Sequence, residues 1–274
     1  MLTESQVKTF QDQGYVRGPR ILDDAQIAIL QDEVLRVIDQ RDRRDQPQPV
    51  LCHNMGTSET TQLWQIVNIW MASIPFRELV LSDTVGKLVA QLMPTTKELR
   101  VWHDQIQFKP AAVGGVNMWH QDSPYWGILT PKDQQVTAWV ALDDVDVDNG
   151  CMKMVPRSQH WGNAIDYLHT LKNFDEMNDV KDYDGHAVEV KACPVRKGEI
   201  HFHHSLTWHG SGLNQSGRPR RAIALHFLTD QSRYVASKNH VMRQFVTVAD
   251  GEVLKGDAFP LVWSSDAVGA GRVG

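Results

Sequence analysis

Apolar residues recur at helical spacing in the first third of the chain. Thr3 or Ser5 can cap a first helix, and Gly14 is a suitable stop for it. A later segment begins with a proline and contains Ser82 and Asp83 as a point of break and restart. The pattern predicts helices over residues 3–13, 23–44 and 74–92.

The pattern changes at about Glu98. Short segments of alternating polar and apolar residues follow, separated by Gly, Pro, Asn and Asp. Strands at this spacing, without helices between them, are typical of an all-β sandwich or barrel rather than a parallel α/β sheet. We therefore expect a mainly β fold with a helical cover. The expected limits are one domain over 1–265, with cover 1–95 and β-core 96–230, and a flexible tail at 266–274.

The composition excludes several classes of protein. The 274 residues are 42% hydrophobic, which is too apolar for a disordered or fibrous chain. A net charge of −5 offers no basic surface to nucleic acid, and no apolar run reaches the roughly 20 residues of a membrane span. Cys52, Cys151 and Cys193 are widely spaced, and the N-terminus has no secretory pattern. We expect a cytoplasmic protein with reduced thiols, a small-molecule substrate and no obligate protein partner.

Six of the nine tryptophans fall between residues 102 and 208, in a region that is also rich in histidine. The sharpest signal there is MWHQDSPYW at 118–126. In an extended strand His120 and Asp122 are two residues apart and project from the same face. One imidazole and one carboxylate side by side supply two sites of a facial metal triad. The alternative is a surface pair without a metal, which this spacing alone does not exclude.

A third ligand is expected in the segment HFHHSLTWH at 201–209. Alternation places His204 on one face, although a turn within HSLT would reset the pattern. His209 is favoured because Gly-Ser-Gly follows it, and glycines allow the backbone to approach a bound group closely. The other face would carry His201, His203, Ser205, Thr207 and His209.

Arginines stand at the start of the apolar strand that follows. Alternation groups Arg220 with Ala222 and Ala224, two small residues that leave room beneath a ligand. Arg221 belongs to the other face. Arg220 is therefore a candidate for a bidentate pair with a carboxylate. The alternative is a solvated end of the strand.

Longer motifs extend these signals over nearly the whole chain. They are LTESQVKTFQDQGYV at the start, Lys109-Pro110, WHQDSPYW, AWVALDDVDVDNGCMKMVP at 138–156, SQHWG at 158–162 and KGEIHFHHSLTWHGSGLN. With these motifs the chain resembles the phytanoyl-CoA dioxygenase family of Fe(II)/2-oxoglutarate-dependent oxygenases. The family pattern H-x-S-x-x-N-x-S-x-x-x-R is filled at every position by His209, Ser211, Asn214, Ser216 and Arg220. One departure is Arg157, where many relatives have glycine.

The resemblance implies a fold and a set of site residues. The fold is a double-stranded β-helix, a cupin-like jelly roll, with N-terminal α-helices. The implied iron ligands are His120, Asp122 and His209. The implied contacts of 2-oxoglutarate are Arg220 to its distal carboxylate, a hydrogen bond from Ser211, and further contacts from Gln105 and Trp139.

The residue pattern agrees with the position of Gln105. In VWHDQIQFKP the alternation places His103, Gln105 and Gln107 on one face, whereas Trp102, Ile106 and Phe108 share the other. The glutamines would turn towards a polar interior and the hydrophobic residues towards the covering helices. Trp139 has a second interpretation as an ordinary core tryptophan.

The activity implied is oxidation of an unactivated C–H bond, with O2 consumed and succinate and CO2 released from 2-oxoglutarate. Asp122 favours hydroxylation, or a related desaturation, epimerisation or ring closure, over halogenation, because halogenating relatives lack this carboxylate. Candidate walls of the substrate pocket are Trp119, Tyr125, Trp126 and Gln107. An acyl-CoA would need a basic entrance that the sequence does not offer. We therefore expect a small metabolite, an amino-acid derivative or a lipid-like molecule.

Two other functions remain open from the sequence. A His/Asp/His site could hold zinc and hydrolyse an ester or amide through a metal-activated water. A hydrolase has no obvious need for Arg220. A cupin-like binding protein that has lost turnover would be expected to lack a ligand, and none is missing.

Overall fold

The computed structural model describes residues 1–56 and 61–266. Its α-helices are α1 (Glu4–Gln13), α2 (Asp24–Asp39), α3 (Ile74–Val80), α4 (Asp83–Leu92), α5 (Asp122–Tyr125) and α6 (Ile165–Leu168). Its 3-10 helices are η1 (Ile69–Met71), η2 (Ser158–Trp161), η3 (Phe174–Asn178) and η4 (Val241–Phe245). No helix in the described ranges is long and apolar enough to cross a membrane. Apart from residue 266, the predicted tail lies outside the described residues.

Sixteen strands are described. They are β1 (Tyr15–Arg20), β2 (Leu51–Asn54), β3 (Trp64–Val67), β4 (Glu98–Lys109), β5 (Asn117–His120), β6 (Leu129–Thr130), β7 (Gln135–Ala141), β8 (Met152–Met154), β9 (Asp182–Tyr183), β10 (His186–Ala187), β11 (Lys191–Cys193), β12 (Glu199–His204), β13 (His209–Ser211), β14 (Arg220–Thr229), β15 (Arg233–Tyr234) and β16 (Leu261–Ser264).

The N-terminal helices are confirmed, with one shorter than expected. Thr3 caps α1 in a capping box, and Gly14 ends it in the left-handed conformation at φ 82°. Ser82 separates α3 from α4. Helix α2 ends at Asp39 rather than near Arg44. Residues 40–45 are all polar, so a longer helix would have no apolar side chain to bury there.

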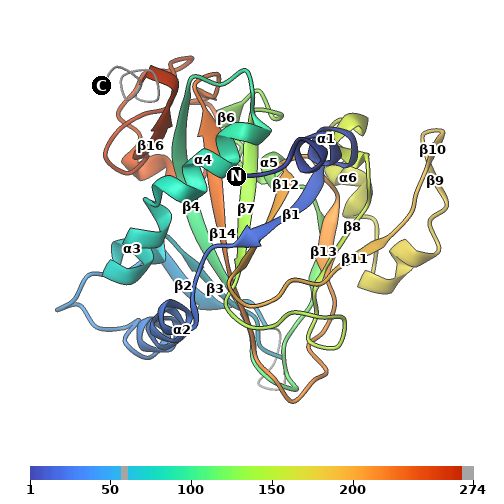
Figure 1. The fold of residues 1–274 in the computed structure, drawn as a ribbon, viewed down its shortest axis with the longest axis horizontal. Helices are drawn as coiled ribbons and strands as arrows, with labels where there is room; N and C mark the ends of the chain where they lie inside the picture. Colours follow the sequence, from blue (N-terminus) through green and yellow to red (C-terminus); the bar gives the residue numbers. More distant parts are fainter. Residues whose placement is uncertain (57–60, 267–274) are drawn as a thin grey trace.

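The strands form two antiparallel sheets of a jelly-roll core. The large sheet has the order β1-β12-β7-β14-β4-β3-β2, with β16 also paired to β4. The small sheet has the order β11-β8-β13-β5. Figure 1 shows α3 and α4 against the large sheet, with strands of the small sheet on the opposite side of the molecule. The mainly β fold with a helical cover is thus confirmed.

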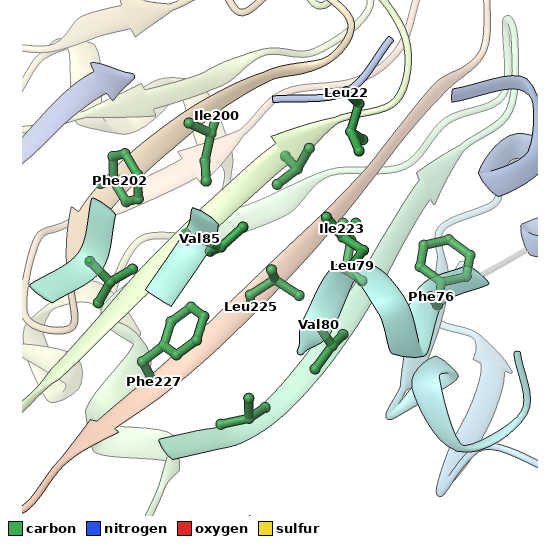
Figure 2. Packing of buried hydrophobic residues seen from close by; sticks show 14 of the residues in the cluster. Leu22, Phe76, Leu79, Val80, Val85, Ile200, Phe202, Ile223, Leu225 and Phe227 are labelled. Carbon is green, nitrogen blue, oxygen red and sulfur yellow. The ribbon is translucent and has the colours of Figure 1, made fainter. Parts of the chain in front are cut away.

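The main hydrophobic core lies between the helices and the large sheet. Figure 2 shows Ile223, Leu225 and Phe227 of β14 on the side that faces α3 and α4, where Leu79 and Val85 pack. Burying such side chains stabilises the fold by about 1.5–3 kcal/mol each. The intervening residues Ala222 and Ala224 face the space between the two sheets. The predicted alternation along this strand is correct.

The N-terminal part of the chain is more than a helical cover. Strand β1 pairs with β12, and β2 and β3 extend the large sheet beyond β4. After residue 230, β16 also joins this sheet. Strands β2 and β3 have only four residues each, and strands this short are hard to predict. Whether such a segment forms a strand depends on its pairing with distant strands.

A bulge in β4 corrects the predicted faces of this strand. His226 of β14 pairs with His103, but the next residue, Phe227, pairs with Val101. Trp102 is therefore the extra residue of a β-bulge, which re-aims a side chain. It packs with Trp126 in a separate cluster rather than with the core under the helices. The expectation that Trp102 shares a face with Ile106 and Phe108 is wrong.

Gly14 ties α1 to the turn between β12 and β13. Its carbonyl accepts hydrogen bonds from the amide of His204 at 2.8 Å and the hydroxyl of Thr207 at 2.9 Å. A Cβ at this position would lie 2.2 Å from Oε1 of Gln159. Gly185, the second residue of the two-residue turn between β9 and β10, also has a positive φ of 80°, and a Cβ there would meet nothing within 4 Å.

We therefore predict that Gly14→Ala destabilises the protein more than Gly185→Ala. Both variants bear the cost of a left-handed alanine, so that cost cancels in the comparison. The steric overlap at Gly14 adds about 1–3 kcal/mol. Urea unfolding of the two variants measures the difference, and equal stabilities would show that Gln159 moves aside freely.

Candidate active site

Two histidines and one aspartate converge between the sheets. His120 ends β5, Asp122 begins α5 and His209 begins β13. His209 lies directly opposite His120 in the antiparallel pair of β13 and β5. One ligand atom from each of the three residues lies within 4.8 Å of the others, so the group could hold a metal ion. The structure thus brings the three predicted ligands together.

The local backbone explains this convergence. The strand itself ends at His120, but Gln121 is still extended, with φ −118° and ψ 145°. Asp122 therefore returns to the side of His120, as the spacing predicted. The turn after His204 takes the chain from the large sheet to the small one, so that of the four histidines in 201–209 only His209 joins the triad.

Hydrogen bonds orient both imidazoles. Nδ1 of His120 lies 2.7 Å from the carbonyl of Met118, and Nδ1 of His209 lies 2.9 Å from the carbonyl of Thr207. A carbonyl can only accept, so each Nδ1 carries the proton and each Nε2 keeps its lone pair. Nε2 of His120 and of His209 lie 3.7 and 3.5 Å from Oδ1 of Asp122. A second bond that fixes the tautomer is typical of metal-binding histidines.

The carboxylate of Asp122 uses its two oxygens differently. Oδ1 faces the two histidine Nε2 atoms, whereas Oδ2 accepts hydrogen bonds from Thr137 at 2.7 Å and from Nε2 of His203 at 3.1 Å. Burial would raise the pKa of Asp122, but the neighbouring imidazoles outweigh it and hold the pKa well below its usual range. The ionised carboxylate therefore presents one free oxygen to a metal.

The pKa values of the two histidines of the triad shift in opposite directions. Burial lowers the pKa of His120 to about 3. Burial would do the same to His209, but the carboxylate of Asp122 outweighs it and raises the pKa of His209. At neutral pH His120 is therefore neutral, the form that a metal requires.

A buried arginine lies beside Trp139 and has no hydrogen-bond partner among the described residues. The side chain of Arg220 is fully buried, and none of its three nitrogens has a hydrogen-bond partner among the described residues. Its guanidinium carbon lies 5.0 Å from the ring centre of Trp139. Burial lowers the pKa of Arg220 to about 10, so it stays charged near pH 7. A buried, unpaired cation is costly, and a carboxylate group would satisfy it.

Lys109 is a residue to which the sequence analysis assigned no role. It is fully buried, opposite Arg220 in the pairing of β4 with β14. Its Nζ lies 2.6 Å from Oγ of Ser211, 2.6 Å from the carbonyl of Gly212 and 3.1 Å from the carbonyl of Ser211. Three oxygens match the three donors of an ammonium group, so Lys109 fixes the Ser211 hydroxyl as an acceptor and leaves its proton free to donate. Burial, and then Arg220, lower the pKa of Lys109.

A cavity of about 500 Å³ is lined by the triad and by Trp139 and Ser211, the residues that Arg220 and Lys109 contact. Among the predicted contacts, Gln105, Gln107, Trp139 and Ser211 line it. So do Tyr125 and Trp126, the first of them half exposed. Arg220 is not part of the lining, but Ala224, four residues further along the same face of β14, is.

The structure does not bring Trp119 to the cavity. His120 faces the triad, so Trp119, one residue earlier in the strand, points to the opposite side. It stacks on Phe174 at 5.3 Å and donates from its indole nitrogen to the carbonyl of Phe174. Trp119 belongs to a separate hydrophobic cluster.

Sequence reasoning missed the hydrogen-bonded residues behind Asp122. Thr137 donates to Asp122 and lies 2.8 Å from Nδ1 of His226. His203 was placed on the face of His209 but given no role. The sequence did offer a signal for Thr137. It stands two residues before Trp139 on one strand, so both side chains lie on the face towards the cavity.

A jelly-roll core that carries two histidines and one carboxylate beside open space is typical of non-haem iron oxygenases. The family model described as phytanoyl-CoA dioxygenase (PhyH) matches residues 10–222. The chain belongs to the phytanoyl-CoA dioxygenase family, as its motifs indicated.

Individual relatives are more distant. The peroxisomal phytanoyl-CoA dioxygenase of Rattus norvegicus is 29% identical over 138 residues, which is 48% of this chain and 40% of the relative. The chain thus spans about half or less of the curated relatives it matches first.

Solved structures match over almost the whole chain. The non-heme alpha ketoglutarate dependent carbocyclase SnoK from nogalamycin biosynthesis has a TM-score of 0.75 at 25% identity, covering 96% of this chain and 97% of SnoK. The epimerase SnoN, solved in complex with Fe3+, alpha ketoglutarate and nogalamycin RO, has a TM-score of 0.70 at 22% identity, covering 95% and 98%. These matches share the fold described above, while the named reactions differ from one protein to the other.

Proposed function

We propose that this protein is an Fe(II)- and 2-oxoglutarate-dependent dioxygenase that hydroxylates, or otherwise oxidises, a C–H bond of a small uncharged organic molecule. Succinate and CO2 would be the co-products. The observation that carries the proposal is a His/Asp/His triad at a cavity whose wall includes Trp139, together with a buried arginine that lies against Trp139 and has no hydrogen-bond partner among the described residues. Family membership supports the same activity.

The donor set fits the metal. His120, Asp122 and His209 would hold Fe(II), which prefers such a mixed set of nitrogen and oxygen ligands. When bound, the iron would supply the activation of O2 and the redox chemistry that amino-acid side chains lack. His203 and Thr137 hold the second oxygen of Asp122, so this carboxylate would use one oxygen and leave coordination positions open.

The other end of the cavity fits a dicarboxylate. Arg220 would pair with the distal carboxylate of 2-oxoglutarate, and Ser211, oriented by Lys109, would donate a hydrogen bond to it. Gln105 and Trp139 line the same cavity as the triad. These four contacts orient the co-substrate and keep water away from it.

The lining of the cavity narrows the class of substrate. Among its described residues there is no lysine, arginine or glutamate, and Asp122 is the one carboxylate. A phosphate-bearing substrate such as an acyl-CoA would find no cation in this lining. Tyr125, Trp126 and Gln107 offer aromatic faces and an amide instead. A succinate-release assay in which an acyl-CoA is the best substrate would contradict this choice.

The decisive experiment is anaerobic addition of Fe(II) and 2-oxoglutarate, with the visible charge-transfer band of their complex as the readout. We expect the band in the wild-type protein and its loss in Asp122→Ala and Arg220→Ala. Asp166→Ala and Arg218→Ala, both exposed, are matched controls that should keep the band. A wild-type protein without the band, or both site variants with an intact band, would refute the proposal.

Lys109→Met is expected to weaken 2-oxoglutarate binding by about tenfold, because the Ser211 hydroxyl loses its orientation and one nearby positive charge disappears. The affinity for Fe(II) should stay unchanged, since Lys109 does not contact the triad. Titration of the charge-transfer band with 2-oxoglutarate measures the effect, and Lys172→Met, an exposed site, is the control. An unchanged 2-oxoglutarate affinity would remove Lys109 from the co-substrate site.

A further inference from the structure

Thr137 has one proton and two polar neighbours. Its Oγ1 lies 2.7 Å from Oδ2 of Asp122 and 2.8 Å from Nδ1 of His226. An ionised carboxylate can only accept, so the single proton of Thr137 goes to Asp122. The hydroxyl must then accept a hydrogen bond from His226. The chain of hydrogen bonds therefore assigns the proton of His226 to Nδ1.

Two rings enclose the imidazole of His226. His226 is 4% exposed, and its ring packs against Trp126 at 4.9 Å and against His103 at 4.6 Å. A neutral imidazole protonated at Nδ1 has a bare lone pair at Nε2. The side chain of His226 thus offers a hydrogen-bond acceptor.

His226 lines the same cavity as the triad. No described residue forms a hydrogen bond with its Nε2, whereas Nε2 of His203 is engaged by Asp122. His103, the neighbouring imidazole, has an enclosed Nε2 with no partner. Of these three histidines in the cavity lining, His226 is the one whose tautomer is fixed through the carboxylate of Asp122. This tautomer leaves Nε2 of His226 as an acceptor.

We propose that Nε2 of His226 accepts a hydrogen bond from the substrate, and that the substrate is an uncharged molecule with a hydroxyl or N–H group near the carbon that is oxidised. This inference rests on the proposed function. His226 would hold the donor three hydrogen bonds away from Asp122, and the ring of Trp126 would contact the carbon skeleton beside it. Thr137 acts as a positioning residue, because it sets the tautomer of His226 without touching the substrate.

The first test is the tautomer itself. ¹⁵N-histidine NMR of protein loaded with diamagnetic Zn(II) and 2-oxoglutarate distinguishes a protonated from a bare ring nitrogen. We expect His226 to be protonated at Nδ1 and bare at Nε2 in the wild type and in Thr137→Ser, which keeps the hydroxyl. In Thr137→Val the tautomer protonated at Nε2 should appear. A wild-type His226 protonated at Nε2, or a Thr137→Val spectrum equal to that of the wild type, would overturn the proposal.

The second test uses phenol and anisole, two probes of similar shape of which phenol alone can donate. Phenol is expected to shift the Nε2 resonance of His226 and to bind about three- to tenfold more tightly than anisole. His226→Phe should remove this preference. A shift of equal size with both probes, or none with phenol up to its solubility limit, would refute the role of His226.

The charge-transfer band, recorded on the same preparation with Fe(II), separates the two hypotheses. If the band forms but the tautomer or the phenol preference is wrong, the inference about His226 fails and the proposed function stands. If the band does not form, the proposed function fails first.

Discussion

Replacing Asp122 with alanine is expected to lower the affinity for Fe(II) by more than about 100-fold. The loss of residues that merely support a metal ligand costs 10–100-fold, so the loss of a ligand should cost more. The variant would keep His120 and His209, whose orientation depends on backbone carbonyls and not on Asp122. Isothermal titration under anaerobic conditions measures the affinity directly.

The same substitution should leave the fold intact, so a lower Fe(II) affinity can be attributed to the missing ligand. Oδ2 of Asp122 is hydrogen-bonded to Thr137 and His203, and removal of the carboxylate leaves both donors facing a cavity that water can enter. Circular dichroism should therefore match the wild type. Asp166→Ala, which changes an exposed carboxylate, should bind Fe(II) normally. Unchanged binding in Asp122→Ala would show that the metal ligands lie elsewhere.

Arg220→Leu is expected to weaken 2-oxoglutarate binding by about two to three orders of magnitude, while the protein without co-substrate stays at least as stable as the wild type. The guanidinium is fully buried and has no hydrogen-bond partner among the described residues, so a leucine removes a cost when no carboxylate is bound. With 2-oxoglutarate present, the same substitution leaves a carboxylate buried without its cation.

Thermal unfolding with and without 2-oxoglutarate separates the two effects. At 100 times the dissociation constant, a ligand stabilises the wild type by about 2.7 kcal/mol, and the leucine variant should gain almost nothing at that concentration. Arg218→Leu is the matched control, because its side chain is half exposed and pairs with Asp146 on the surface. If Arg220→Leu responds to 2-oxoglutarate as the wild type does, Arg220 does not bind it.

Local sequence patterns correctly predicted several helix ends and one strand face. The capping residue Thr3, the stop at Gly14 and the break at Ser82 depend on neighbours a few positions away, so the sequence displays them directly. The alternation of Arg220, Ala222 and Ala224 was also correct, because a continuous strand turns successive side chains to opposite faces.

Sequence patterns led to a wrong prediction, or to none, where a feature depends on contacts between residues far apart in the chain. The bulge at Trp102 arises from the register between β4 and β14, which no local pattern in β4 contains. The role of Lys109 depends on the carbonyls of Ser211 and Gly212, more than a hundred residues later. Arg157, the departure noted from the family motif, has a φ of 68°, a backbone conformation that glycine adopts at less steric cost.

The sequence by itself determined the helical cover, the alternating strands and the residue types of the candidate site, because periodicity and motif spacing are local properties of the chain. The tertiary structure decided which histidine of 201–209 meets His120, by sending the chain from one sheet to the other after His204. It also decided that Arg220 is buried with no hydrogen-bond partner in the described part of the chain, and that Thr137 links Asp122 to His226. These relations depend on strand pairing between segments far apart in the sequence, and packing in three dimensions fixes them.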